Sequence, residues 1–182
     1  GLSWGLYRAG IRNVHDGISI DIALSLLDST NSYLTRLGAA QFLARSKNLD
    51  LTGRSALITR SASRDVSTFV RMACTQALEK LNDKNSFNAL IALSQASDYR
   101  IRVNAEQIAA VATKKDLTSI KSLQNETLNW RVKALLYGTI LKLAENKEEI
   151  ISEIEAAFNQ SDNEYYKASL IRALGNSILA NE

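Results

Sequence analysis

The sequence has no proline among its 182 residues, and it has a single cysteine and a single methionine. Because proline interrupts helices by removing a backbone donor, its absence favours long helices joined by Asn, Asp, Ser and Gly turns. The lone cysteine, Cys74, excludes an internal disulfide and a cysteine-based metal site. It falls on an apolar helix position, so we expect a buried thiol that packs as a small hydrophobic side chain.

Long hydrophobic runs are also missing. No stretch approaches the roughly 18 to 20 apolar residues that a membrane-spanning helix needs. The first residues, GLSWGLYRAG, lack the basic-then-apolar layout of a signal peptide. The composition, 46% hydrophobic and 23% charged, is typical of a folded soluble protein without a membrane span.

The residue types of common catalytic sites form no recognisable group. The sequence lacks a nucleophile paired with histidine, a glycine-rich phosphate loop and a cluster with metal-ligand spacing. The only histidine, His15, lies in a VHDG segment, where we expect a loop or cap residue. Four glutamates form an acidic cluster of the kind typical of a solvated helix face: Glu148, Glu149, Glu153 and Glu155. We therefore predict that this chain is not an enzyme and needs no cofactor or metal.

Charge is unevenly distributed along the chain. Residues 1–140 hold 18 Lys and Arg against 11 Asp and Glu, and residues 141–182 hold 4 against 8. Such a dipolar distribution can orient a charged partner, although solvated helix faces produce it as well.

Five segments repeat one helical pattern around a basic residue, here called the anchor. The anchors are spaced by 35, 31, 29 and 36 residues: Arg36, Arg71, Arg102, Arg131 and Lys167. Three and seven positions after each anchor stand small or aliphatic residues, which form one stripe of a helix. This seam consists of Ala39, Cys74, Ala105, Ala134, Leu170, Leu43, Leu78, Ala109, Gly138 and Leu174. Small side chains in the seam would let neighbouring helices approach closely.

A helix-capping residue precedes every anchor by four positions: Ser32, Ser67, Asp98, Thr127 and Asn163. Such side chains accept a hydrogen bond from an unpaired backbone N–H at the start of a helix. We therefore predict helix starts at these residues. Partner helices are expected at 16–29, 51–63, 86–95, 116–123 and 147–159, where apolar residues keep helical spacing. The anchors themselves are expected to hydrogen-bond turns and neighbouring caps.

The repetition predicts an all-α, right-handed α-solenoid of about five helix pairs, forming one array over residues 1–182. A half-repeat leads the array, because LYRAGIRN at 6–13 matches LIRALGNS at 170–177 and aligns Ser3 with the anchors. The chain starts midway through a repeat, and its end leaves Ile178 and Leu179 uncovered. We therefore expect a fragment of a longer protein.

The D-x-x-x-R-x-x-A pattern, clearest in DYRIRVNA at 98–105, resembles the HEAT repeat, particularly its short bacterial forms. The resemblance covers nearly the whole chain. Two departures are a period near 33 residues, below the 40–47 usual for this family, and the missing family prolines. Ankyrin and tetratricopeptide arrays have closer periods, but their motifs are absent. The resemblance implies HEAT-like, armadillo-like helix pairs whose capped helices line a concave face.

Three segments are also similar to the HEAT portion of bacterial cyclophilin-type prolyl isomerases: SWGLYRAGIR at 3–12, AAQFLARSKNLDL at 39–51, and DYRIRVNA. In those proteins the array accompanies a separate catalytic β-barrel, which nothing in this sequence resembles. The similarity implies that any peptidyl-prolyl isomerase activity belongs to another part of a larger parent. It also implies the bacterial cytoplasm or cell envelope, without choosing between them.

The expected concave face consists of positions two, five and nine after each anchor, which point away from the seam. Its polar candidates are Gln41, Arg45, Gln76, Lys80, Asn104, Gln107, Lys133 and Arg172, and an apolar patch is expected at Leu136 and Ile140. The glutamine amides can pair with the backbone of an extended peptide, and the cations can receive carboxylates. Glutamine is equally a good helix former on a solvated face.

The function predicted from this face is a non-catalytic protein–protein interaction scaffold that binds a protein or an extended peptide. The alternative is a nucleic-acid-binding module that uses the basic stretch of Arg45, Lys47, Arg54, Arg60, Arg64 and Arg71. Asp50 and Asp65 interrupt that stretch, and no aromatic residues interleave for base stacking. Trp130 and Tyr137 share a helix that is apolar nearly all round, which fits a covered helix better than an aromatic cage.

Overall fold

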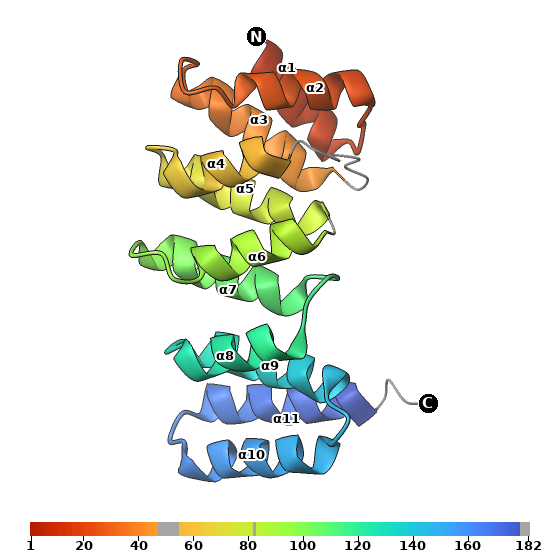
Figure 1. The fold of residues 1–182 in the computed structure, drawn as a ribbon, viewed down its shortest axis with the longest axis vertical. Helices are drawn as coiled ribbons and strands as arrows, with labels where there is room; N and C mark the ends of the chain where they lie inside the picture. The colour runs from red at the N-terminus through yellow and green to blue at the C-terminus, as the bar shows by residue number, and fades with distance from the viewer. Residues whose placement is uncertain (47–54, 82, 179–182) are drawn as a thin grey trace. The chain divides into compact units, whose positions relative to one another are not determined.

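A computed structural model describes residues 1–46, 55–81 and 83–178. Residues 176–178 are described by their backbone alone. These residues form eleven α-helices and no strand, which confirms the all-α prediction for this part of the chain (Figure 1). The chain divides into two compact units, residues 1–114 and 115–182. Unit 1 holds α1 Leu2–Ile11, α2 Gly17–Leu26, α3 Tyr33–Arg45, α4 Ser55–Arg64, α5 Thr68–Lys80, α6 Lys84–Leu93 and α7 Tyr99–Val111. Unit 2 holds α8 Leu117–Glu126, α9 Trp130–Leu143, α10 Lys147–Gln160 and α11 Glu164–Ile178.

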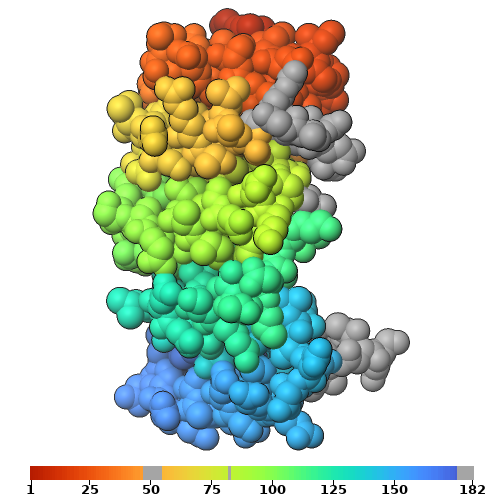
Figure 2. Space-filling view, viewed as in Figure 1, coloured from red at the N-terminus to blue at the C-terminus, as the bar shows by residue number. Residues whose placement is uncertain are grey.

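Alternate helices of unit 1 form two layers (Figure 1). In the first layer α1 packs against α3, α3 against α5, and α5 against α7. The second layer, α2, α4 and α6, covers one side of the first and supplies the face of unit 1 seen in Figure 2. In unit 2, α9 packs against α8, α10 and α11. That position confirms the prediction that the helix of Trp130 and Tyr137 is a covered one.

The small-residue seam of the first-layer helices is buried. Ala39, Cys74 and Ala105 have no exposed surface, and Leu78 is 1% exposed. The expectation of a buried Cys74 is therefore confirmed. Burial and the charge of Asp65 raise the pKa of the Cys74 thiol, so the thiol stays protonated and packs as a hydrophobic group.

Two glycines bring α1 and α3 into close contact. A Cβ atom on Gly38 would lie 2.9 Å from the backbone oxygen of Ser3, and one on Gly10 would lie 3.3 Å from Cα of Phe42. The first distance is shorter than any that real Cβ atoms adopt, so the two helices meet at Gly38 only because a side chain is missing there. Ser3 is the residue that the repeat alignment places in the anchor position.

Four of the five predicted caps of the repeated helices are confirmed. The side chains of Ser32, Ser67, Asp98 and Asn163 accept hydrogen bonds from backbone N–H groups in the first turns of α3, α5, α7 and α11. The prediction for Thr127 is wrong. Asn129 caps α9, because its Oδ1 accepts from the N–H groups of Arg131 at 3.0 Å and Val132 at 3.3 Å. Thr127 is instead the buried C-terminal cap of α8, where its hydroxyl accepts from the backbone of Asn129.

The partner helices lie close to the predicted ranges and share a cap of their own. At the starts of α2, α6 and α8, an aspartate accepts the backbone N–H of a serine three residues on: Asp16 with Ser19, Asp83 with Ser86, and Asp116 with Ser119. In the first two pairs the serine hydroxyl also donates to the aspartate, at 3.0 and 2.7 Å. The first four residues of the helix predicted at 51–63 lie outside the described residues, and α4 extends to Arg64.

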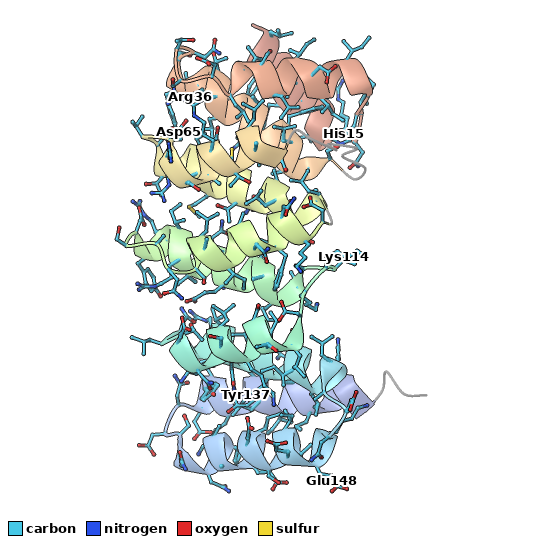
Figure 3. All side chains as sticks on the ribbon, in the orientation of Figure 1. His15, Arg36, Asp65, Lys114, Tyr137 and Glu148 are labelled. Atoms are coloured by element: carbon cyan, nitrogen blue, oxygen red, sulfur yellow. The ribbon has the colours of Figure 1, made fainter. Side chains whose placement is uncertain are left out.

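The anchors make structural contacts within the protein. The buried Arg36 forms a bidentate pair with Asp65, with Nε–Oδ2 at 2.7 Å and Nη2–Oδ1 at 3.1 Å (Figure 3). Its Nη1 donates to the carbonyl of Asn31 at 2.6 Å, and Asp65 also accepts from the backbone of Ser67, the cap of α5. Arg71 donates to the carbonyl of Ala62. The remaining anchors lie over aromatic rings: Arg102 over Tyr99, Arg131 over Trp130, and Lys167 over Phe158.

None of the described helices is both long enough and apolar enough to cross a membrane.

The α1–α3 contact predicts opposite effects for two glycine substitutions. Gly38→Ala is expected to destabilise the protein by roughly 1–2 kcal/mol, because overpacking outweighs the gain in helix propensity. Gly5→Ala places a methyl group on α1 where nothing lies within 4 Å, so it should stabilise by roughly 0.5–1 kcal/mol. Urea denaturation measures both. Equal effects of the two substitutions would contradict the described contact.

The Arg36–Asp65 pair predicts a large loss of stability for Asp65→Ala. Removing one partner leaves a buried charge unpaired, which costs about 3 kcal/mol or more in the free energy of unfolding. Adding Arg36→Met to Asp65→Ala should then cost little more, because the two side chains act together. Glu79→Ala is the control. It removes a partly exposed pair with Lys80, at 3.2 Å, and should change the free energy by less than about 1 kcal/mol. If the losses in the free energy of unfolding from Arg36→Met and Asp65→Ala simply add in the double variant, the two side chains do not interact as described.

Candidate partner-binding groove

A hollow of about 580 Å³ lies between α3 and α5 of unit 1. It is called the groove below. Its lining consists of Tyr33, Leu37, Gln41, Ala44 and Arg45 from α3, and of Phe69, Met72, Ala73 and Gln76 from α5. Three of the predicted concave-face residues, Gln41, Arg45 and Gln76, are thus brought together in one place.

The aromatic residues of the groove stand in the first turns of its two helices. Phe69 is 62% exposed and Tyr33 is 41% exposed. Phe69 lies two positions before the anchor Arg71. At about 100° per residue, this position is on the same helix face as the positions two, five and nine residues after the anchor. Sequence reasoning missed Phe69 because it followed this face only forward from the anchor. Following it one turn back would have found Phe69 and Leu34, which is 70% exposed.

The glutamine side chains on this face are available to a ligand. Gln41 is half-exposed, and Gln76 and Gln107 are exposed. Within the described residues their side-chain amides form no hydrogen bond. Each amide offers both a donor group and an acceptor, which is what an extended backbone needs.

Arg45, the last residue of α3, is held in place from two sides. Its Nη1 donates to the carbonyl of Gln41 at 2.9 Å, and its guanidinium lies 5.1 Å from the centre of the Tyr7 ring. Tyr7 in turn stacks on Trp4, with ring centres 5.3 Å apart. No acidic side chain lines the groove, and no described carboxylate pairs with Arg45.

Other predicted residues of unit 1 lie outside the groove. Lys80 is half-exposed and pairs with the neighbouring Glu79. The amide of Asn104 donates to the carbonyl of Met72 at 3.2 Å, so it joins α7 to α5. Gln107 is exposed on α7.

The prediction of an apolar patch at Leu136 and Ile140, in unit 2, is wrong. Leu136 has no exposed surface and Ile140 is 1% exposed. The reason is the register of α9, which begins at Asn129 and not at Thr127. Leu136 and Ile140 lie seven and eleven residues after this cap, as the buried seam residues Ala39 and Leu43 lie after Ser32, so they occupy seam positions. Arg172 is exposed on α11.

Lys133 lines a separate, polar hollow of about 440 Å³ in unit 2, together with Gln124, Tyr137, Glu153 and Tyr166. Burial, and then the proximity of Tyr137, raises the pKa of Tyr166 to about 12. Burial also raises the pKa of Tyr137, against a hydrogen bond from Gln124 that lowers it. Both phenols therefore stay neutral near pH 7, and the hollow presents neutral polar groups beside one amine and one carboxylate.

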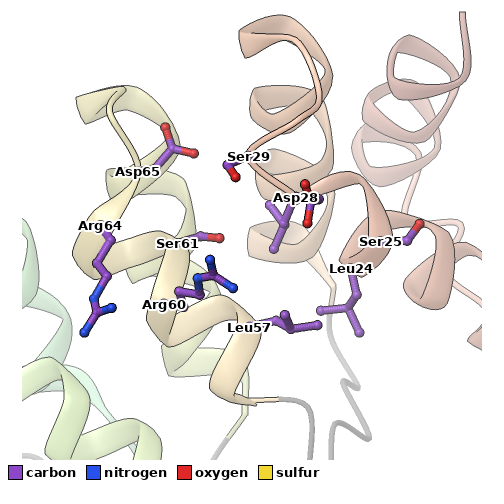
Figure 4. A pocket seen from close by; sticks show the side chains of 10 residues that line it. Leu24, Ser25, Asp28, Ser29, Leu57, Arg60, Ser61, Arg64 and Asp65 are labelled. Carbon is purple, nitrogen blue, oxygen red and sulfur yellow. The ribbon is translucent and has the colours of Figure 1, made fainter.

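A third hollow, of about 370 Å³, lies between α2 and α4 in unit 1 (Figure 4). It contains Arg60 and Arg64 of the basic stretch, but also Asp28 and Asp65. Hydrogen bonds from Thr30, and then the charge of Arg60, lower the pKa of Asp28. Since Asp65 is engaged by Arg36, both carboxylates already have partners within the protein.

The described cations of the basic stretch do not form one surface. Arg45 lines the groove, Arg60 and Arg64 line the hollow between α2 and α4, and Arg71 donates to a backbone carbonyl. Lys47 and Arg54 lie outside the described residues.

His15 lies in the loop between α1 and α2, as expected, with its ring 5.0 Å from that of Phe42. The described residues contain no group of three or more His, Cys, Asp or Glu side chains placed to hold a metal ion.

Comparison with protein-family models, with curated proteins and with solved structures gave no significant match.

Proposed function

We propose that the chain is a HEAT-like, right-handed α-solenoid of about five helix pairs and a leading half-repeat, and that it serves as a protein-interaction scaffold. Its partner is an extended peptide or a peptide-like segment of a protein, bound in the groove between α3 and α5. The similarity to prolyl isomerase arrays supports a place in a larger protein of that type.

The solenoid proposal is supported by the way equivalent helices pack in unit 1. Helices α3, α5 and α7 begin at equivalent caps and contact one another in order, and their equivalent small residues are buried. A repeated contact of this kind can be continued by every further unit, which is the principle of a repeat array.

The observation that carries the binding proposal is the composition of the groove. It combines exposed Tyr33 and Phe69, Met72, a positioned Arg45 and two glutamines without internal partners. Aromatic residues, Met and Arg are the types enriched where proteins meet, whereas Lys, Glu, Asp, Ser and Ala are depleted there. The groove of unit 1 has four residues of the enriched types and no Lys, Glu, Asp or Ser, and its depleted residues are Ala44 and Ala73.

The size of the groove suits a short extended segment. Tyr33 and Arg45 are the first and last residues of α3, so they are separated by about 18 Å along the helix. An extended peptide covers that distance with about five or six residues. Gln41 and Gln76 then stand on opposite walls between the two ends, where they can pair with its backbone.

Binding of synthetic peptides tests this proposal. Seven-residue peptides selected on the immobilised protein should lose about tenfold or more in affinity with Phe69→Ala, because an aromatic anchor is removed. Gln76→Ala should weaken binding by a smaller factor through lost hydrogen bonds. Ile18→Ala, which removes an apolar side chain that is 75% exposed on α2, is the control. Fluorescence anisotropy measures affinity, and circular dichroism checks the fold. Peptides that bind wild type and Phe69→Ala equally would refute the site.

Nucleic acid is the alternative partner. The separation of Arg45 from Arg60 and Arg64 gives it less support than a peptide. An oligonucleotide that binds at low salt and is released steeply as salt rises would favour this alternative.

A further inference from the structure

We infer that the groove between α3 and α5 selects acidic peptides, with the ligand's carboxylate on Arg45 and an apolar side chain between Tyr33 and Phe69. This inference rests on the proposed function and specifies its ligand.

Arg45 has the properties of a carboxylate receptor. A guanidinium has five N–H donors in a planar fork that matches a carboxylate. One nitrogen of Arg45 donates to the Gln41 carbonyl, and the Tyr7 ring lies against the guanidinium. These two contacts fix the group in place and leave most of its donors unused. A fixed arginine binds an anion at a lower entropic cost than a mobile one.

Comparison with other basic residues of unit 1 supports this role. The fork of Arg36 is filled by Asp65 and by the Asn31 carbonyl. Arg100 pairs with Asp98 at 3.3 Å, and Lys80 pairs with Glu79 at 3.2 Å. Among the described residues the charge of Arg45 has no acidic partner. Arg102, which lies over Tyr99, has none either, but it does not line the groove.

The opposite end of the groove is apolar. The Phe69 and Tyr33 rings and the side chains of Leu37 and Met72 form its lining there. Leu37 and Arg45 are about 12 Å apart along the helix, and Tyr33 and Arg45 about 18 Å. An apolar residue four to six positions from the carboxylate therefore reaches both ends at once.

The charge of unit 1 has the matching sign. Residues 1–114 hold 14 Lys and Arg against 9 Asp and Glu, a net charge of +5. This field raises the rate of encounter with acidic ligands and disfavours basic ones.

The test is an array of synthetic seven-residue peptides that carry Leu or Phe four to six positions from Glu, each paired with the same peptide containing Gln. Every peptide is made with a free and with an amidated C-terminus, which separates a side-chain carboxylate from a terminal one. Affinities are measured by fluorescence anisotropy for wild type, Arg45→Gln, Arg45→Lys and Phe69→Ala. Arg64→Gln is the matched control, because it makes the same substitution on α4.

We expect the carboxylate-containing peptides to bind wild type about tenfold more tightly than their neutral counterparts. Arg45→Gln should abolish this preference, Arg45→Lys should retain part of it, and Arg64→Gln should leave it unchanged. Phe69→Ala should weaken the binding of acidic and neutral peptides by the same factor.

Two outcomes would overturn the inference, and they differ in what they say of the groove. If acidic and neutral peptides bind equally in all variants, while Phe69→Ala still weakens both, the groove binds peptides without selecting a charge. If no peptide depends on Phe69, neither the inference nor the proposed function holds.

Discussion

The close contact between helices of the first layer of unit 1 is the constraint on which the rest depends. Ala39, Cys74 and Ala105 are fully buried on α3, α5 and α7, and Gly38 lets α1 and α3 approach closely. Interiors pack as densely as organic crystals, so this contact leaves no room for larger side chains. Because the seam fixes one side of each helix, the opposite side presents residues of successive helices side by side. The groove between α3 and α5 is a consequence of that arrangement.

Polar groups then determine where each helix begins. Serine, aspartate and asparagine side chains cap the helices, and the Arg36–Asp65 pair connects α3 to the turn that precedes α5. These contacts add less stability than the apolar contacts, but they are directional, and a shifted helix start would leave them unpaired. Apolar burial holds the layers together, and the caps set the register in which Gln41 and Gln76 share one hollow.

Patterns within one helix were predictable from the sequence, whereas properties that depend on neighbouring helices were not. The seam and four caps follow from local spacing and local chemistry. Thr127 and Asn129 are both good caps two residues apart, and the sequence does not show which of them is buried against α8. The Asp-x-x-Ser starts of α2, α6 and α8 are local patterns of the same kind. The same choice of cap decides Leu136 and Ile140: counted from Thr127 they fall on the outward face, whereas counted from Asn129 they fall on the buried seam.

The most direct measurement of the central claim is the thermal stability of two leucine variants of α7. Ala105 lies in the seam and has no exposed surface, whereas Gln107, two residues on, is exposed on the face proposed to bind. If the seam sets the distance between helices, Ala105→Leu destabilises the protein by roughly 1–3 kcal/mol through overpacking. Gln107→Leu then changes stability by less than about 0.5 kcal/mol. A tolerated Ala105→Leu, or a larger loss from Gln107→Leu, would mean that the two faces of the helix have been assigned the wrong way round.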